Sequence, residues 1–340
     1  MSVTQNPRVL IIGGLGYFGS RLASALCDNF EVTVTSRSLS DTRKDWLVQQ
    51  KGKVKNIYFD SAEQVQLPEP VPFDFLINLS TANSTEAAQN FEGCVSASLK
   101  TLEACTNLLS RGTAKRLIHF SSFHVYGSPG AEANHEDSER IPLHPYGKVH
   151  FEAEKWLEKN AATLPITVLR PTNGVGAPAH NDLGVQSKLL FLDCCRQAVE
   201  EGQIRLKSDG SAYRDFVPLI DFINAIRTIL VSPIVPLSFY NLASGKVSTL
   251  RELALAIQDK ATEFLNRPIT LTMGTLKDPL NRPFTIQIDK LMNLGWSPGN
   301  YLNREIHQTL AFYKVIKNTS LPQEALAIGA DRAIPFRPNV

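Results

Sequence analysis

The sequence predicts an α/β fold in which a doubly wound parallel sheet is followed by a smaller C-terminal α/β lobe. Short β-branched runs alternate with longer segments of helical apolar spacing, a pattern typical of parallel strands joined by crossover helices. A glycine-rich turn, Gly14-Leu15-Gly16-Tyr17-Phe18-Gly19, directly follows the first β-branched run. After Arg170, proline and glycine interrupt the alternation, which indicates that a second lobe begins there.

The individual elements are expected from the same spacing. Strands are expected at Arg8–Ile12, Glu31–Ser36, Lys55–Phe59, Phe73–Leu79, Arg116–Ser121, Ile166–Arg170 and Ser238–Leu242. Long helices are expected at Glu86–Ser110 and Tyr146–Asn160. We therefore divide the chain into a first domain over residues 1–170, a second lobe over 171–318 and a C-terminal extension over 319–340. In open α/β folds the chain can also pass between lobes more than once.

Composition and charge narrow the class of protein. The 340 residues are 43% hydrophobic and 20% charged, which is typical of a globular chain rather than a disordered one. The net charge of +2 comes without a cluster of Lys and Arg, so we expect neither nucleic acid nor an anionic membrane as a partner. The sequence has no apolar run long enough to span a membrane and does not begin with a secretory signal, so we expect a cytoplasmic protein.

The five cysteines are an odd number and include no C-x-x-C pair. This pattern predicts reduced thiols in the core rather than a disulfide framework or a zinc ribbon. We therefore expect no metal site.

The glycine-rich turn has the context of a Rossmann-like dinucleotide-binding fingerprint, because it follows a strand and opens a helix. Glycine permits a tight turn and a close approach of the backbone to a pyrophosphate, and the helix start supplies free N–H groups. The candidate pyrophosphate-binding residues are Gly13, Gly16, Tyr17, Phe18 and Gly19. A glycine turn without a ligand is the competing interpretation, but the order of strand, turn, helix and second strand favours the fingerprint. Residues 1–170 are thus the expected dinucleotide-binding domain, and 171–318 the expected substrate-binding lobe.

The end of the second strand normally selects between NAD(H) and NADP(H), because an acidic residue there binds the adenosine ribose. This chain has Ser36 and Arg37 at that place and no carboxylate. A hydroxyl followed by a guanidinium suits a 2′-phosphate, so we expect NADP(H) rather than NAD(H). Asp60 and Ser61, after the third strand, are candidates for the adenine edge, and a simple turn or helix cap is the alternative.

Further motifs follow in a fixed order. They are Phe120-Ser121-Ser122-Phe123-His124-Val125-Tyr126-Gly127, Pro145-Tyr146-Gly147-Lys148, Leu169-Arg170-Pro171-Thr172-Asn173, Tyr213-Arg214-Asp215-Phe216-Val217, Tyr240-Asn241-Leu242-Ala243-Ser244-Gly245 and Leu294-Gly295-Trp296-Ser297-Pro298. With them the chain resembles the extended short-chain dehydrogenase/reductase family of nucleotide-sugar epimerases, dehydratases and reductases. The resemblance implies that Ser122 hydrogen-bonds the reacting oxygen and that Tyr146 is the catalytic tyrosine. A positioned phenol beside a hydroxyl suits the proton transfer that accompanies hydride transfer.

One position departs from the family pattern. The family has lysine four residues after the tyrosine, where it binds the nicotinamide ribose and lowers the pKa of the phenol, and here that residue is His150. Residues four apart share a helix face, so His150 should face the cofactor with Tyr146, whereas Lys148 should face away. We expect a histidine that is partly charged at neutral pH. A phenol without a neighbouring cation is a poor base but a serviceable proton donor, which favours ketone reduction.

A second departure concerns the residues after the catalytic serine. Dehydratases of the family carry acidic residues there, and this chain has Phe123 and His124, so a dehydratase is not expected. His124 either takes part in proton transfer or lines the substrate pocket. By resemblance, the nucleotide pyrophosphate and sugar are contacted by Asn173, Arg214 and Arg282, each of which has a structural role as its alternative.

These observations support an NADPH-dependent reductase of a nucleotide-linked keto-sugar, in which Tyr146 protonates the developing alkoxide. The first alternative is a nucleotide-sugar epimerase that keeps its cofactor bound. The second alternative is a protein that binds NADP(H) without catalysis. The resemblance also implies a homodimer that pairs the two long helices, although their apolar faces could serve the core alone.

Overall fold

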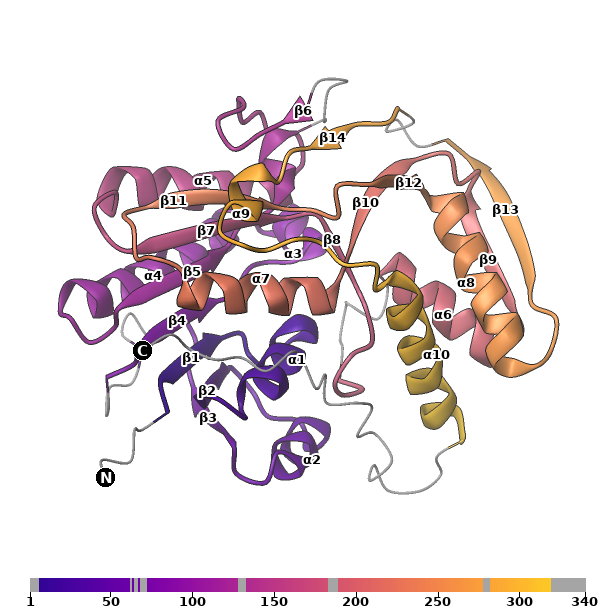
Figure 1. Ribbon diagram of the computed structural model, residues 1–340, viewed down its shortest axis with the longest axis horizontal. Helices are drawn as coiled ribbons and strands as arrows, with labels where there is room; N and C mark the ends of the chain where they lie inside the picture. The colour runs from indigo at the N-terminus through magenta and orange to yellow at the C-terminus, as the bar shows by residue number, and fades with distance from the viewer. Residues whose placement is uncertain are drawn as a thin grey trace.

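The computed structural model of the chain describes residues 6–61, 63, 67, 72–127, 133–182, 189–277 and 282–318. Its centre is a seven-stranded sheet with the strand order β11-β7-β5-β4-β1-β2-β3, in which every neighbouring pair is parallel (Figure 1). The strands are β1 (Arg8–Ile12), β2 (Glu31–Ser36), β3 (Val54–Tyr58), β4 (Phe75–Asn78), β5 (Arg116–Phe120), β7 (Ile166–Pro171) and β11 (Ser238–Leu242). The predicted strands are therefore confirmed, with ends that shift by no more than two residues.

Helices cover both faces of this sheet. One face packs against α1 (Tyr17–Leu26), α2 (Asp41–Gln49) and α7 (Leu219–Val231), and the other packs against α4 (Phe91–Ser110) and α5 (Pro145–Asn160). The two faces are built from alternate residues of each strand. In β1, for example, Val9 and Ile11 belong to one core and Leu10 and Ile12 to the other, and all four are almost fully buried. The predicted Rossmann-like, doubly wound α/β architecture is confirmed.

The expected helix Glu86–Ser110 is wrong in one respect, because the structure divides it at Asn90. The first part is α3 (Ser84–Gln89), and the second part is α4. Asn90 has φ −145° and ψ 70°, and its side chain accepts a hydrogen bond from the backbone N–H of Gly93. Asparagine is a strong helix-capping residue, so it ends one helix and starts the next within an apolar pattern that continues through it.

A second core lies to the right of the sheet in Figure 1 and contains three helices. They are α6 (Leu190–Glu201), α8 (Leu250–Leu265) and α10 (Leu302–Asn318). Three small sheets complete the described fold: β12-β10-β8, β13-β9 and β14-β6. Their strands are β6 (Ala133–Asn134), β8 (Asn173–Val175), β9 (Gln203–Ser208), β10 (Tyr213–Pro218), β12 (Val247–Thr249), β13 (Thr270–Leu276) and β14 (Thr285–Ile286). The remaining described helices are the short α9 (Asp289–Met292) and a 3-10 turn, η1 (Phe123–Tyr126).

The chain crosses between the two parts several times. After β10 it returns to the large sheet as α7 and β11, and β11 pairs with β7 along Ser238–Leu242. Residues 219–242 therefore belong to the sheet layers although they follow residue 170.

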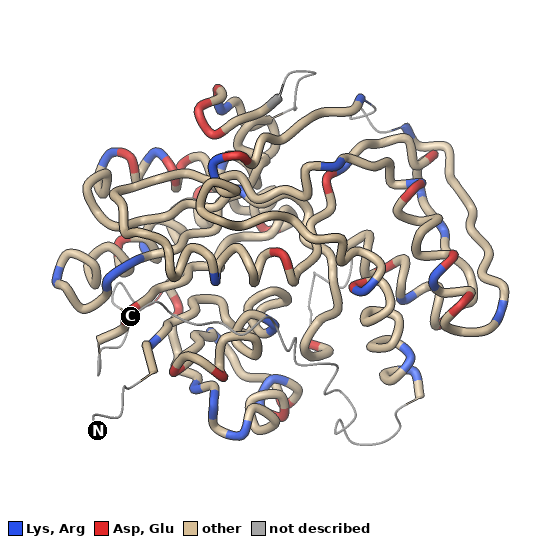
Figure 2. Tube along the Cα trace, viewed as in Figure 1, with Lys and Arg blue, Asp and Glu red and all other residues tan. Residues whose placement is uncertain are grey.

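Lys and Arg and also Asp and Glu are scattered along the chain, and both signs occur beside the large sheet and in the second part (Figure 2). Cys105, Cys194 and Cys195 are buried thiols, whereas Cys27 and Cys94 are partly exposed, so the expectation that all five lie in the core is wrong for these two. Within the described ranges, no helix is both long and apolar enough to cross a membrane. The same ranges contain no group of three or more His, Cys, Asp or Glu residues placed to hold a metal ion.

Candidate active site

The glycine-rich turn connects the carboxyl end of β1 to α1 and is shaped by close backbone contacts. Gly13 has φ +78°, a left-handed conformation that glycine adopts without strain. A Cβ atom on Gly19 would lie 2.5 Å from the carbonyl oxygen of Gly13, so only glycine lets α1 approach the turn this closely. Gly16 precedes α1 as its N-cap residue and its backbone N–H donates to Gly13 at 3.0 Å.

The start of α1 is suited to an anion. No described side chain caps this helix, and its first turn contains no acidic residue. The backbone N–H groups at its start are therefore free for a phosphate, and the positive end of the helix dipole favours one. The side chains of Tyr17 and Phe18 have other contacts: the Tyr17 hydroxyl donates to the carbonyl of Gly176 at 2.5 Å, and the Phe18 ring packs 5.1 Å from that of Phe222. The side chains of these two residues are thus engaged elsewhere, and their backbone N–H groups are the parts that could bind a pyrophosphate.

The carboxyl ends of β2 and β3 lie side by side, next to this turn in the sheet order. The Ser36 hydroxyl donates to the side-chain oxygen of Asn56 at 2.9 Å, and Arg37 is exposed. The backbone N–H of Phe59 donates to Ser36, which places the partly buried Asp60 and Ser61 beside the same strand end. The structure thus brings together the four residues expected to bind the adenosine part of the cofactor.

Ser122 and Tyr146 meet where β5 ends and α5 begins. Ser122 is buried, and its hydroxyl hydrogen-bonds the Tyr146 side chain. Tyr146 lies in the first turn of α5 because Pro145 opens that helix and the His144 ring accepts a hydrogen bond from the Tyr146 backbone N–H at 3.2 Å. A Cβ on Gly147 would lie 2.5 Å from the carbonyl oxygen of His124, so glycine permits α5 to approach η1. Burial raises the pKa of Tyr146 more than the bond from Ser122 lowers it.

His150 lies one turn further along α5, on the same face as Tyr146, and the two ring centroids are 4.7 Å apart. Its side chain is 2% exposed, and Nε2 is 3.2 Å from the Thr81 hydroxyl. Burial, with smaller contributions from His119 and His124, lowers the pKa of His150 to about 3. The expectation of a partly charged imidazole is therefore wrong. The ring is neutral at neutral pH because burial disfavours its charged form. Lys148 is exposed, as the helical spacing predicts.

A buried carboxylate behind the site was missed by the sequence analysis. Glu154 follows His150 by one more helical turn, is fully buried, and accepts a hydrogen bond from the Ser121 hydroxyl at 2.6 Å. Arg170 donates to both of its oxygens, at 2.9 and 2.8 Å, and Arg140 donates to one at 2.9 Å. These bonds fix the end of β5 against α5, which carries Tyr146. The four-residue spacing of Tyr146, His150 and Glu154 is the signal that could have revealed it.

The candidate substrate-binding residues come from several elements. The Asn173 amide donates to the carbonyl of Asp215 at 2.9 Å, which joins β8 to β10 one residue after Arg214. His124 is partly exposed, with its ring 5.6 Å from that of Tyr146. Burial, then the charge of Arg214, lowers the pKa of His124 to about 4, so this ring is also neutral at neutral pH.

Arg282 is exposed and is brought near η1 by its neighbour in sequence, Phe284. Phe284 is buried, and its ring stacks on that of Phe123, with centroids 6.3 Å apart and an angle of 9° between the rings. His124 lies beside Tyr146, and Arg214 is close enough to His124 to lower its pKa.

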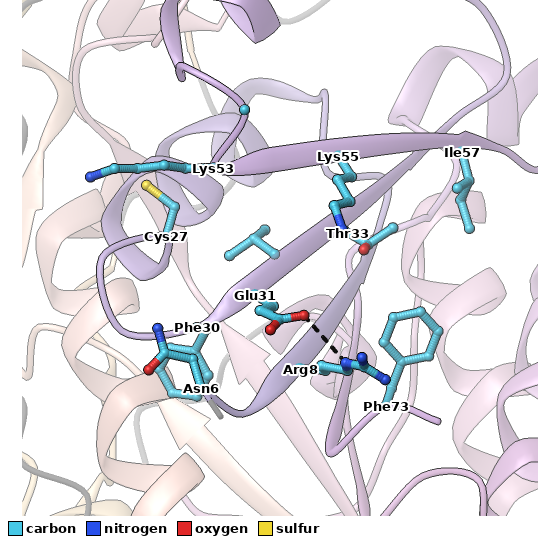
Figure 3. Close-up of a pocket in the computed structure, with 12 residues that line it drawn as sticks. Asn6, Arg8, Cys27, Phe30, Glu31, Thr33, Lys53, Lys55, Ile57 and Phe73 are labelled. Carbon is cyan, nitrogen blue, oxygen red and sulfur yellow. Dashed lines mark hydrogen bonds and ion pairs between the residues drawn. The ribbon is translucent and has the colours of Figure 1, made fainter. Parts of the chain in front are cut away.

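A cavity of about 480 Å³ lies at the other end of the strands, beside the amino ends of β1, β2 and β3 (Figure 3). The ion pair between Arg8 and Glu31, at 3.3 Å, crosses it, and Cys27 and Phe30 contribute to its wall. Open α/β sheets bind their ligands at the carboxyl ends of the strands. This cavity is therefore separate from the site formed by the glycine-rich turn, Ser122 and Tyr146.

The model of the NAD dependent epimerase/dehydratase family matches residues 9–243 of the chain. Among curated relatives, a putative UDP-arabinose 4-epimerase 4 from Arabidopsis thaliana is 26% identical over 286 residues. This match covers 75% of the chain and 64% of the relative, so the chain spans less than two thirds of that relative's length.

Solved structures share the fold at lower identity. UDP-glucuronic acid 4-epimerase from Bacillus cereus, in complex with UDP-glucuronic acid and NAD, is 19% identical with a TM-score of 0.72, and the match covers 91% of this chain and 99% of that one. RMD from Pseudomonas aeruginosa, complexed with NADPH, is also 19% identical with a TM-score of 0.70, and the match covers 91% and 100% of the two chains.

Proposed function

The chain belongs to the NAD dependent epimerase/dehydratase family, and we propose that it epimerises a nucleotide-linked sugar at a carbon that carries a hydroxyl group. The observation that carries this proposal is the hydrogen-bonded pair of Ser122 and Tyr146 beside a glycine-rich turn built for a dinucleotide. The similar curated and solved proteins support an epimerase more strongly than the keto-sugar reductase that the sequence suggested, since UDP-sugar 4-epimerases recur among them.

A nicotinamide cofactor fits the residues present. The turn leaves no room for a Cβ at Gly14 or Gly19, and the free N–H groups of α1 can hold a pyrophosphate. When bound, the cofactor supplies a hydride acceptor and donor for the sugar carbon. The exposed Arg37, with Ser36 beside it, supports NADP(H) as the preferred form, because a guanidinium matches a 2′-phosphate.

The proton chemistry falls to the chain's own residues. Tyr146 takes the hydroxyl proton of the sugar as the ketone forms and returns it when the opposite face of that carbon is reduced. The Ser122 hydroxyl orients the sugar oxygen and hydrogen-bonds the tyrosine during both steps. Because the sugar carbon regains the hydride that it loses, and its hydroxyl regains the proton, the sugar and the cofactor end in the redox states in which they began.

His124, Asn173 and Arg214 are proposed to bind the sugar nucleotide. His124 lies on η1, which packs beside Tyr146, and Asn173 and Arg214 lie on the paired strands β8 and β10. Arg214 supplies a guanidinium suited to the diphosphate, while the neutral ring of His124 can donate or accept one hydrogen bond with a sugar hydroxyl.

One observation favours a second candidate, the reduction of a nucleotide-linked keto-sugar by NADPH. The neutral His150 leaves Tyr146 without the cation that would stabilise a phenolate, and burial raises the pKa of Tyr146 further. A tyrosine that keeps its proton is a better acid than base. Reduction of a ketone needs only the acid.

The two candidates differ in stoichiometry. We would incubate the full chain with UDP-linked sugars and follow the sugar signals by proton NMR, then add NADPH with a keto-sugar and follow absorbance. Formation of an epimer without consumption of cofactor supports the epimerase, and consumption of one NADPH per keto-sugar supports the reductase. The Tyr146→Phe variant should lose either activity while still binding the dinucleotide. Binding of the dinucleotide without turnover of any sugar would refute both candidates and leave the non-catalytic alternative.

A further inference from the structure

A segment from the second half of the chain contacts the first half at two places, the glycine-rich turn and the loop after β2. This bridging segment comprises residues 176–182 and follows β8. At its start, the Tyr17 hydroxyl donates to the carbonyl of Gly176 at 2.5 Å, and Arg21 donates to the carbonyl of Ala177 at 3.2 Å. The buried Glu305 of α10 accepts hydrogen bonds from Arg21 at 2.6 Å and from the backbone N–H of Ala177 at 3.2 Å. The segment is thereby anchored to both parts of the molecule.

His180 joins the middle of the bridging segment to the glycine-rich turn. Its side chain is 2% exposed, its Nδ1 accepts from the backbone N–H of Asp182 at 3.2 Å, and its Nε2 is 3.1 Å from the carbonyl oxygen of Leu15. Since Nδ1 is the acceptor, Nε2 carries the proton of the neutral ring and donates it to Leu15. The ring also packs edge-on against Trp46 of α2, with centroids 6.0 Å apart.

Asp182 joins the end of the segment to the loop after β2. Its Oδ2 accepts from the Ser40 hydroxyl at 2.5 Å and lies 3.0 Å from the Nε of Arg43. Ser40 is the N-cap of α2 and follows Ser36 and Arg37 by a few residues. The exposed fractions of Arg43 and Asp182 are 23% and 28%, so water screens this ion pair only in part.

From these contacts we infer that His180 and Asp182 are positioning residues of the dinucleotide site, which hold the glycine-rich turn and the loop after β2 at the spacing that the bound cofactor requires. The inference rests on the proposed function, because it takes those two segments as the pyrophosphate and adenosine sites. Leu15 lies between Gly14 and Gly16, and Ser40 leads into α2, so each contact acts on a segment that would touch the cofactor. A site held in its binding geometry loses less conformational entropy when the ligand binds.

The test is the binding of NADPH and NADH to the full-length chain, measured by fluorescence titration and by the rate of dissociation after addition of excess competitor. In Asp182→Asn, the ion pair with Arg43 is lost and the bond from Ser40 is weakened. In His180→Phe, the ring contact with Trp46 is kept while the donor to Leu15 is removed. We expect each variant to raise the dissociation constant about fivefold, mostly through faster dissociation. Thermal unfolding, measured in parallel, reports whether each variant is folded.

The matched control is Asp28→Asn, which breaks an ion pair with Lys53 near the amino ends of β2 and β3. This variant should bind both dinucleotides as the unmodified chain does. Unchanged dissociation constants and rates in both folded bridging variants would overturn the inference, and so would an equal loss of affinity in the Asp28 control. If the unmodified chain bound neither dinucleotide, the proposed function would fail as well, and that result is distinct from binding that the variants leave unaltered.

Discussion

Replacement of His150 by lysine tests whether the missing cation sets the acidity of Tyr146. The ring centroids of Tyr146 and His150 are 4.7 Å apart, so an ammonium group in the place of the imidazole would lie about 5 Å from the phenol. At an effective dielectric constant of about 20, this separation corresponds to about 3 kcal/mol of attraction for the phenolate, or roughly two pKa units. Part of the gain is lost because the buried ammonium is itself desolvated. We expect the pKa of Tyr146 to fall by about one to two units.

The assay is the pH dependence of kcat/KM in the direction that oxidises the sugar hydroxyl, measured from roughly pH 6 to 10, which covers the ordinary pKa of a phenol. In the unmodified chain the rate should rise only at the alkaline end, because burial raises the pKa of Tyr146. In His150→Lys the rise should move to lower pH by about one to two units, the expected fall in the pKa of Tyr146. The reductive direction should change less near neutral pH, since a protonated phenol already serves as the acid there.

His150→Gln is the control, because glutamine can still hydrogen-bond the Thr81 hydroxyl and carries no charge. Its profile should match that of the unmodified chain. If the lysine and glutamine variants shifted the profile equally, or if neither shifted it, the charge at this position would not control Tyr146 and the reasoning would be refuted.

Three further predictions follow from buried groups and close contacts. Glu154→Gln should lower the free energy of unfolding in urea by about 3–5 kcal/mol, because it leaves the buried Arg170 without its carboxylate. Glu158→Gln, on the exposed side of the same network, should lower it by less than about 1 kcal/mol. Equal effects of the two variants would contradict this account. Gly19→Ala places a Cβ 2.5 Å from a carbonyl oxygen and should weaken dinucleotide binding about tenfold in a fluorescence titration, and an unchanged affinity would show that the turn can relax. Burial lowers the pKa of His119 from 6.5 to about 4, so across that interval the unfolded chain binds a proton that the folded chain does not. The free energy of unfolding should therefore fall as pH falls from 6.5 to about 4. His119→Gln should reduce that dependence, and the exposed-site variant His135→Gln should leave it intact.

Local patterns in the sequence were sufficient to predict the sheet and to single out Ser122 and Tyr146, which the structure places together. The glycine-rich turn, Ser122 and Tyr146 are recognisable because each depends on neighbours a few residues away, and their elements form where the spacing predicts. The division of the predicted long helix at Asn90 escaped prediction because the apolar spacing continues across the break, and only the backbone conformation reveals it.

What the sequence could not predict depends on long-range packing. The neutral state of His150 results from its burial, and burial is a property of the whole fold rather than of a motif. Glu154 is an ordinary helical glutamate until Arg170 and Ser121 are placed around it. The contact between His180 and Leu15 spans most of the first half of the chain, so no local pattern announces it.

The return of β11 to the edge of the large sheet limits how this protein can be divided or recombined. A fragment that ended at residue 170 would lack the strand that covers β7 and the helix α7, and would expose a parallel strand edge and much of one hydrophobic face. Unfolding of the two parts should consequently be coupled in a single cooperative transition. An engineer who wished to exchange the part that contains α6, α8 and α10 would need several junctions, placed on both sides of α7 and β11, because a single crossover would separate segments that fold together.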